Sequence, residues 1–131
     1  MNFISILLFS ENPEKLSDFY SKVFQKDPDW SESGYYGFMV GQSVITIGPH
    51  DKVKGKSKNP ERIMLNFETE DVKGEFERVK DIEGAEVIAE PYSPDEEEKT
   101  FISTLADPDG NFFQITSTWE EMSEGMENLS N

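Results

Sequence analysis

Apolar and polar positions at the start of the chain predict a strand followed by an amphipathic helix. Apolar residues alternate through residues 2–9, which is typical of a half-buried strand. Asn12 can cap a helix, and Pro13 suits its first position. The buried stripe of this helix is expected at Leu16, Phe19, Tyr20 and Val23. We expect the segment 26–28, Lys-Asp-Pro, to end the helix, because the residue before a proline disfavours helical backbone.

Three short strand-like runs and a lysine-rich segment follow this helix. The runs cover residues 29–32, 35–40 and 43–48, and the Gly41-Gln42 pair is typical of a hairpin turn between the last two. The segment 49–60, PHDKVKGKSKNP, has no apolar periodicity and contains four lysines. We interpret it as a linker or exposed loop.

The same order of elements restarts after the lysine-rich segment. A strand is predicted at residues 62–68, and Asp71 can cap a helix whose inner face carries Phe76 and Val79. Gly84 stands where a C-terminal cap is expected. Three further strands are predicted at residues 85–90, 100–106 and 111–117, with the acidic loop SPDEEEK between the first two. The last residues, EEMSEGMENLSN, are interpreted as a frayed tail or a short terminal helix.

The two halves of the chain therefore repeat the order strand-helix-strand-strand-strand. Setting FISILLFSENPEKLSDFYSKV against RIMLNFETEDVKGEFERVKDI pairs Ser5 with Met64, although few residues are identical. Four strands and one helix leave one sheet face uncovered, so neither half can bury its sheet alone. We expect a single domain over residues 1–118, with module one at 1–49, a linker at 50–60, module two at 61–118 and a tail at 119–131.

Composition and charge narrow the classes of function. The 131 residues carry a formal net charge of -15, which repels nucleic acid and anionic membranes, so we expect neither as a partner. The charge is interpreted first as a well-solvated surface and second as attraction of a cationic ligand. No apolar run reaches the roughly 18 residues that cross a bilayer, and the N-terminus shows no basic region or cleavage site. Together with the absence of cysteine, these features predict a cytoplasmic protein without disulfides or thiolate metal sites.

Three segments of the chain resemble the vicinal oxygen chelate superfamily, which includes glyoxalase I, extradiol dioxygenases, and fosfomycin and bleomycin resistance proteins. The segments are FISILLFSENPEKLSDFYSKVF, RIMLNFETEDV and DPDGNFFQI, and the similarity runs from Phe3 to Thr116. The resemblance implies an α+β fold of paired βαβββ modules, which form a curved mixed sheet around a central cup that holds the ligand. It also implies that the modules pair either within a chain or across a dimer, and we expect a homodimer.

The metal-binding positions of the superfamily carry unsuitable residues here. In metal-using members four inward-facing positions supply the ligands, and the resemblance places them at Ser5, Thr46, Met64 and Gln114. Such a site needs imidazole or carboxylate ligands, and none of the four residues offers one. The only histidine, His50, lies in the lysine-rich segment. We therefore expect no metal cofactor, which argues against the metal-dependent chemistry of glyoxalase I and the extradiol dioxygenases.

The four positions either fill the interior of the cup or line a metal-free ligand pocket. We favour the pocket, because a buried glutamine and threonine need hydrogen-bond partners that a ligand can provide. Asn66 lies two residues after Met64 and therefore on the same face of its strand. Phe38 and Phe112 share the parity of the threonine and the glutamine, so we expect them to stack on a planar ligand. The predicted ligand-binding residues are Ser5, Thr46, Met64, Gln114, Asn66, Phe38, Phe112 and Trp30.

Three functional hypotheses follow from the resemblance. The first is metal-independent binding of a small molecule, such as a cationic antibiotic, in the cup between the modules, as in the bleomycin resistance proteins. The second is a glyoxalase-like enzyme of lyase, isomerase or dioxygenase type, with an atypical metal site or an unidentified catalytic group, for which Tyr36, Glu68 and His50 are weak candidates. The third is a degenerate member kept for dimerisation or regulation.

The segment Asp107-Pro108-Asp109-Gly110 can serve either as a tight turn or as an acidic ligand loop. Proline at the second position and glycine at the fourth suit a type I turn. We expect Asp107 to accept backbone N–H groups as a turn cap, which leaves it poorly placed to bind a metal. The turn is predicted to join a strand that ends at Ala106 to one that starts at Asn111.

Overall fold

Two consecutive βαβββ units form the described part of the chain, which is residues 1–130 of the computed structural model, with residues 125–130 described by their backbone alone. Unit 1 is Met1–Ser57 and unit 2 is Lys58–Asn131. The boundary between them falls inside the segment that the sequence predicts as a linker. The repeated order of elements confirms the predicted α+β class and its two βαβββ modules.

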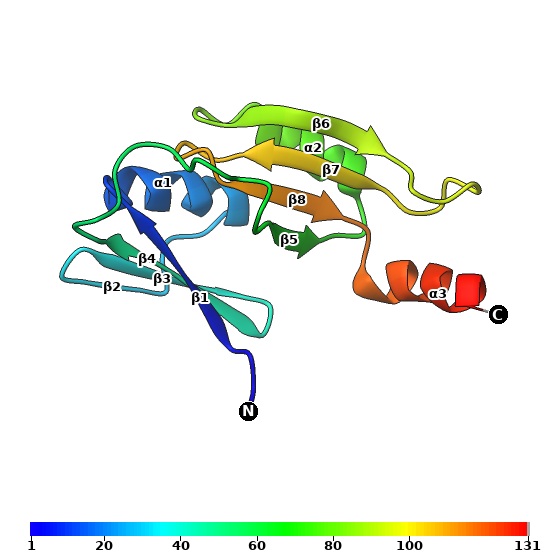
Figure 1. The fold of residues 1–131 in the computed structure, drawn as a ribbon, viewed down its shortest axis with the longest axis horizontal. Coiled ribbons are helices and arrows are strands. Elements are labelled where there is room, and N and C mark those ends of the chain that lie inside the picture. The colour runs from blue at the N-terminus through cyan, green and yellow to red at the C-terminus, as the bar shows by residue number, and fades with distance from the viewer. Residues whose placement is uncertain (131) are drawn as a thin grey trace. The chain divides into compact units, whose positions relative to one another are not determined.

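Unit 1 is a mixed four-stranded sheet with one helix packed against it (Figure 1). Its elements are β1 (Ser5–Ser10), α1 (Pro13–Phe24), β2 (Trp30–Glu32), β3 (Tyr35–Val40) and β4 (Ser43–Pro49). The strands lie in the order β1-β4-β3-β2, with β1 parallel to β4 and the other pairs antiparallel. The predicted two-residue turn is confirmed, because Val40 pairs with Ser43 and Gly41 has a φ of 60°.

Helix α1 begins as the sequence predicts and ends slightly earlier. The side chain of Asn12 accepts a hydrogen bond from the Lys15 N–H at 3.3 Å, and Pro13 takes the first helical position. The helix ends at Phe24 because Gln25 adopts a left-handed conformation with φ 57° and donates its N–H to the Ser21 carbonyl. The predicted stripe is confirmed: the buried residues of α1 include Leu16, Phe19, Tyr20 and Val23.

Unit 2 repeats the topology of unit 1 with its own sheet and helix. Its elements are β5 (Leu65–Glu68), α2 (Val72–Lys80), β6 (Glu86–Tyr92), β7 (Ile102–Ala106), β8 (Phe112–Thr116) and α3 (Trp119–Ser130). The strands lie in the order β5-β8-β7-β6, with β5 parallel to β8. In Figure 1, α2 lies against one face of this sheet.

Helix α2 confirms its predicted cap and buried face, and it corrects the predicted end. The Asp71 side chain accepts the Gly74 N–H at 3.0 Å, and Phe76 and Val79 are buried. The helix ends at Lys80, so its C-terminal cap is the following Asp81 and not Gly84. Gly84 instead provides a φ of 98° in the turn that leads into β6.

A terminal helix, α3, follows the last strand of unit 2. Thr118 and Glu121 form a capping box: the Thr118 hydroxyl accepts the Glu121 N–H at 3.3 Å and donates to its carboxylate at 2.9 Å. The Glu68 carboxylate also accepts the Trp119 N–H, which joins the end of β5 to the first turn of α3. Of the two interpretations of the last residues, the structure shows the helix. No helix of the described residues is long and apolar enough to cross a membrane.

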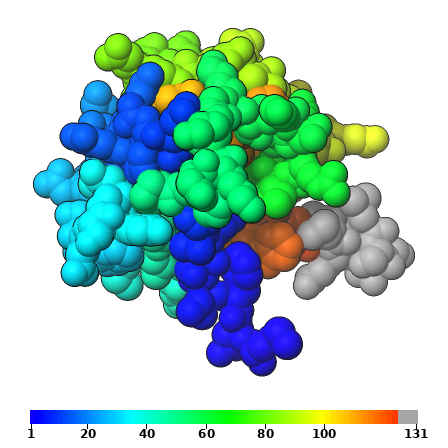
Figure 2. Space-filling view, turned by 60° about the vertical axis from the view of Figure 1, so that its left-hand side comes forward, coloured from blue at the N-terminus to red at the C-terminus, as the bar shows by residue number. Residues whose placement is uncertain are grey.

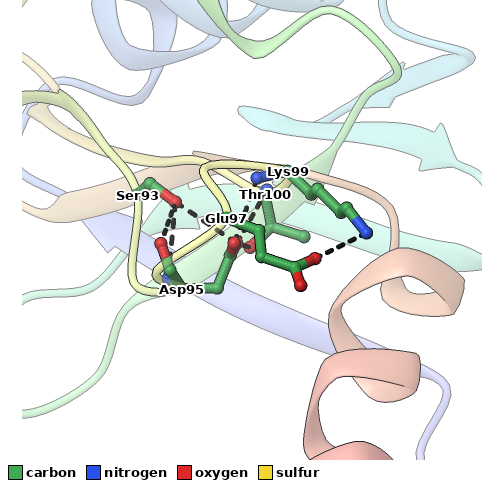
Figure 3. A network of polar contacts seen from close by, with 5 residues as sticks. All are labelled: Ser93, Asp95, Glu97, Lys99 and Thr100. Atoms are coloured by element: carbon green, nitrogen blue, oxygen red, sulfur yellow. Dashed lines mark hydrogen bonds and ion pairs between the residues drawn. The ribbon is translucent and has the colours of Figure 1, made fainter.

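The acidic loop between β6 and β7 is organised around the Asp95 carboxylate (Figure 3). This carboxylate accepts the N–H groups of Lys99 and Thr100 at 3.0 and 2.9 Å, and it also accepts the hydroxyls of Thr100 and Ser93. These bonds, the Thr100 hydroxyl first, hold the pKa of Asp95 below its usual value near 3.8. The loop therefore owes part of its structure to an ionised carboxylate.

We expect acid to weaken this loop selectively. Because the folded-state pKa of Asp95 is lowered, its contribution to stability is complete above pH 3.8 and is lost progressively as the pH falls below that value. The difference in melting temperature between the wild type and Asp95→Asn should therefore be present at pH 6 and shrink below pH 4. Glu96→Gln is the control, because Glu96 is an exposed residue of the same loop. It should leave the dependence of the melting temperature on pH unchanged. An Asp95→Asn difference that is constant down to pH 2 would contradict the assignment.

Candidate functional site

Each sheet has one face packed against the helix of its βαβββ unit, α1 in unit 1 and α2 in unit 2, and we call the opposite face the open face of the unit. In unit 1 the face covered by α1 is buried: Phe38 and Ile47 are fully inaccessible, and the rings of Phe24 and Phe38 lie 5.5 Å apart. Strand pairing places alternate residues on the opposite side. The open face of unit 1 therefore carries Ser5, Leu7, Phe9, Trp30, Glu32, Tyr35, Gly37, Met39, Val44, Thr46 and Gly48.

Two predicted site residues, Ser5 and Thr46, lie on this open face. Thr46 is half-buried in the middle of the sheet, where it pairs with Leu7 of β1 and Gly37 of β3. Ser5 pairs with Val44 at the start of β1 and is exposed. The structure therefore places both hydroxyls on the same side of the sheet, two residue positions apart along the strands.

Two aromatic side chains of the open face lie over glycines of the neighbouring strand. The Trp30 indole occupies the space that a side chain at Gly37 would fill, and the Tyr35 ring does the same at Gly48. Both glycines are in strands, where a side chain would normally occupy this position. The predicted site residue Trp30 is thus fixed across the sheet, next to Thr46, which is the β4 partner of Gly37.

The prediction that Phe38 shares a face with Thr46 is wrong. Phe38 pairs with Ile45, while Thr46 pairs with Gly37, so the phenylalanine points to the opposite side of the sheet. There it is fully buried against α1. The physical reason is the even, two-residue turn between β3 and β4, which pairs even-numbered residues with odd-numbered ones.

The open face of unit 2 brings together the polar residues predicted there. Gln114 pairs with Asn66 of β5 and with Thr104 of β7, so all three side chains lie on one side of the sheet. The Gln114 amide donates to the Thr104 hydroxyl at 3.1 Å. Asn66 is exposed, and its amide donates to the backbone carbonyl of Met64, which directly precedes β5. Met64 itself is half-buried.

Phe112 lies on the same face as Gln114, as predicted. It pairs with Ala106 at the end of the β7-β8 hairpin and is half-buried. On the other face, Phe113 is fully buried, and its ring lies 6.0 Å from that of Phe67. The open face of unit 2 therefore combines an aromatic ring with an amide and a hydroxyl that are already hydrogen-bonded to each other.

The residues at the four metal-binding positions of the superfamily do not fit a divalent metal. Ser5 and Thr46 offer neutral hydroxyls, Met64 a soft thioether and Gln114 an amide, whose nitrogen already donates to Thr104. Divalent ions of the kind bound by imidazole and carboxylate ligands gain too little from such donors to replace their water. Across the described residues, no group of three or more histidine, aspartate or glutamate side chains is arranged to hold an ion.

The three weak catalytic candidates come from three different segments of the chain, two of them in unit 1 and one in unit 2. Tyr36 is half-buried on the helix side of unit 1, where it lines a groove of about 730 Å³ beside α1 with Ser17, Asp18 and other polar residues. His50 is exposed after β4, and its Nδ1 accepts the Lys52 N–H at 3.1 Å. Glu68 is exposed at the end of β5, with its carboxylate on the Trp119 N–H. Neither Tyr36 nor His50 is among the strand residues of the two open faces.

The segment 107–110 forms the turn that the sequence predicts. Asp107 is buried, and its carboxylate accepts the N–H groups of Asp109 and Asn111 at 2.9 and 3.0 Å and also the Asn111 amide. Gly110 has a φ of 78° and donates its N–H to the Asp107 carbonyl. The following strand starts at Phe112, one residue later than predicted. Asp107 thus closes a turn with both of its carboxylate oxygens.

Two residues of the open faces were missed in the prediction of the site. Tyr35 is not among the predicted ligand-binding residues, although its ring occupies the Cβ position of Gly48 on the open face of unit 1. Thr104 could have been found by counting backwards from the turn, because the odd-length connection pairs Ala106 with Phe112 and hence Thr104 with Gln114.

Comparison with known proteins identifies the family to which these two units belong. A glyoxalase-like domain family matches residues 5–116. A glyoxalase-related enzyme from Fulvimarina pelagi has a TM-score of 0.72 at 18% identity, over 89% of this chain and 88% of that chain. A glyoxalase/bleomycin resistance protein/dioxygenase family enzyme from Burkholderia phytofirmans has a TM-score of 0.69 at 22% identity, over 86% and 95%. The fosfomycin resistance protein FosX from Listeria monocytogenes has a TM-score of 0.70 at 22% identity, over 92% and 97%.

These structural likenesses, all below 25% identity, concern the fold, and a search of curated proteins found no match. The family match is different in kind, because it spans nearly the whole of both units, from the first residue of β1 to the last residue of β8. On that match, the chain belongs to the glyoxalase-like domain family of the vicinal oxygen chelate superfamily.

Proposed function

We propose that this chain binds a small organic molecule on the open faces of its sheets without a metal ion. The observation that carries the proposal is the character of the side chains there: two hydroxyls, a thioether and one amide stand at the superfamily's metal positions, and the aromatic rings of Trp30 and Phe112 lie on the same faces. A few oriented polar groups on a largely apolar wall are typical of small-molecule sites. Such donors suit an organic ligand better than a divalent ion.

Gln114 is the residue we assign to hold the polar part of the ligand. Its amide nitrogen donates to Thr104, which fixes the orientation of the side chain. The amide oxygen accepts no hydrogen bond from the described residues, so it remains available to a ligand N–H. A half-buried acceptor of this kind favours an amine or amide donor over an anion.

The net charge favours a cationic ligand. At -15 over 131 residues, the protein attracts cations and repels anions at long range. The Listeria neighbour is a fosfomycin resistance protein, and capture of an antibiotic is one form that binding would take here. For this chain the charge favours a cationic antibiotic, such as a glycopeptide of the bleomycin type.

A thermal-shift assay on metal-stripped protein tests the proposal. We expect a cationic glycopeptide antibiotic to raise the melting temperature equally with and without EDTA. A ligand at 100 times its dissociation constant stabilises the folded state by about 2.7 kcal/mol. Gln114→Ala should weaken the binding about tenfold, because it removes the acceptor assigned to the ligand.

Gln42→Ala is the matched control, because Gln42 is an exposed glutamine in the turn between β3 and β4. It should leave the shift unchanged. Glutathione adducts and catechols serve as comparison ligands. The proposal is wrong if the purified protein contains stoichiometric zinc, nickel, iron or manganese whose removal abolishes the shift, or if none of the compounds produces one.

A further inference from the structure

We infer that Trp30 and Tyr35 form an aromatic platform on the open face of unit 1 that stacks against a planar organic cation. The inference rests on the proposed function and narrows it to one ligand class. Trp30 is 45% exposed and Tyr35 is 36% exposed, although both rings lie against the sheet. Figure 2 shows the cyan segment of β2 and β3 at the surface of the protein.

Two glycines hold the rings in this orientation. Indole atoms Nε1, Cε2 and Cζ2 of Trp30 fill the position of a Cβ at Gly37, and ring atoms of Tyr35 fill that position at Gly48. Neither glycine has a positive φ, so neither is required by the backbone conformation. Because these glycines have no side chain, each ring can lie across the neighbouring strand, and the exposed fractions of Trp30 and Tyr35 leave part of each residue open to a ligand.

The spacing of the two glycines sets the size of the platform. Gly37 pairs with Thr46, and Gly48 lies two residues further along β4, so the glycines are diagonal neighbours. Diagonal positions on paired strands are about 7–8 Å apart. Two rings at this spacing extend over a larger area than a single benzene ring, which fits a ligand of several fused or linked planar rings.

The charge of the face selects a cation. Among the strand residues of this open face, Glu32 is the only carboxylate and no basic residue is present. Glu32 pairs with Tyr35, so it lies at the edge of the platform. Aromatic faces attract cations, and the attraction increases when the ligand displaces water. The net charge of -15 adds a long-range attraction of the same sign.

The charge of this face argues against a second copy of this chain as the occupant of the platform, and leaves the predicted homodimer to another surface. The face carries Glu32 and no basic residue, so a second copy seated on it through the same face would bring a carboxylate and no cation to pair with it. A small cation meets no such repulsion. Self-association through the platform is therefore treated as an outcome of the test.

Calorimetric titration with proflavine, a planar tricyclic cation, tests the inference directly. Trp30→Leu and Tyr35→Leu should each weaken binding about tenfold, the loss of one stacking contact. Gly37→Ala keeps both aromatic side chains but forces Trp30 off its glycine, and it should weaken binding similarly. Planar 9-anthracenecarboxylate and non-planar tetraethylammonium should bind at least tenfold more weakly than proflavine.

Tryptophan emission offers a second readout: in a Trp119→Phe background Trp30 is the sole tryptophan, and proflavine should quench its fluorescence.

Tyr92→Leu is the matched control, because Tyr92 is an aromatic residue in β6 of unit 2 that is 50% exposed. It should leave proflavine affinity unchanged. Equal weakening by Tyr92→Leu and Tyr35→Leu would show non-specific attraction of the dye and overturn the inference. So would variants that leave proflavine binding intact but convert a dimer to a monomer in light scattering, since the platform would then be a subunit interface.

The outcomes also separate this inference from the proposed function. If the glycopeptide binds and depends on Gln114 but not on Trp30 or Tyr35, the platform is wrong and metal-free binding stands. If proflavine depends on the platform while Gln114→Ala has no effect on any ligand, the platform stands and the role of Gln114 is wrong. If neither compound binds, both fail.

Discussion

Phe38→Ala is expected to lower the free energy of unfolding by about 3–5 kcal/mol, the usual cost of removing a buried phenylalanine. Phe38 has no exposed surface, and its ring contacts Phe24 of α1. The change would leave a cavity between the helix and the sheet. Because native proteins are stable by only about 5–15 kcal/mol, this is a large share of the total, and chemical denaturation would measure it.

Met39→Ala is the matched control, because Met39 is the next residue in β3, points to the open face and is 56% exposed. It should cost less than about 1 kcal/mol. Comparison of these two variants also decides whether Phe38 lies on the helix side of the sheet or on its open face. If Phe38 lined the ligand site, Phe38→Ala would weaken proflavine binding directly and leave stability nearly unchanged, and the registry of β3 on β4 would be wrong.

The error on Phe38 shows what periodicity alone can and cannot predict. Alternation correctly located β3 and β4, and the Gly41-Gln42 turn was recognised. Which residues share a face depends on the number of residues in the turn. Two residues pair 40 with 43, so residues of equal parity lie on opposite faces, whereas the five residues between Ala106 and Phe112 keep equal parity on one face. Equal parity therefore fails for Phe38 and Thr46, which lie on either side of the β3-β4 turn, and holds for Phe112 and Gln114, which lie two residues apart in one strand.

Other features depend on side-chain placement that a single sequence does not specify. The position of Trp30 over Gly37 requires both the strand register and the rotamer of the indole. The start of helix α3 is easier to predict from the sequence, because Thr118 and Glu121 have the spacing of a capping box. That signal is short and local, and it predicts where a helix begins without predicting how far it continues.

Asp107→Ala is expected to destabilise the protein by about 2–4 kcal/mol, because it leaves two backbone N–H groups of the turn without their acceptor. Asp107 is 2% exposed, and its carboxylate accepts the N–H groups of Asp109 and Asn111 and also the Asn111 amide. Asp107→Asn retains one acceptor oxygen and should cost less. Chemical denaturation of the three proteins at pH 7 should give a free energy of unfolding that decreases from the wild type to Asp107→Asn and again to Asp107→Ala.

Asp109→Ala separates turn building from the mere presence of an acidic side chain. Asp109 lies in the same turn, but its Oδ2 is buried without a hydrogen-bond partner among the described residues. Removing an unsatisfied carboxylate oxygen relieves a desolvation cost, so this variant should match the wild type within about 0.5 kcal/mol or be more stable. If Asp107→Ala instead left the free energy of unfolding unchanged but abolished ligand binding, the turn would be part of the binding site. The hydrogen bonds of Asp107 argue for a structural role: the turn fixes the register that brings Thr104 beside Gln114, the residue that we propose to hold the ligand.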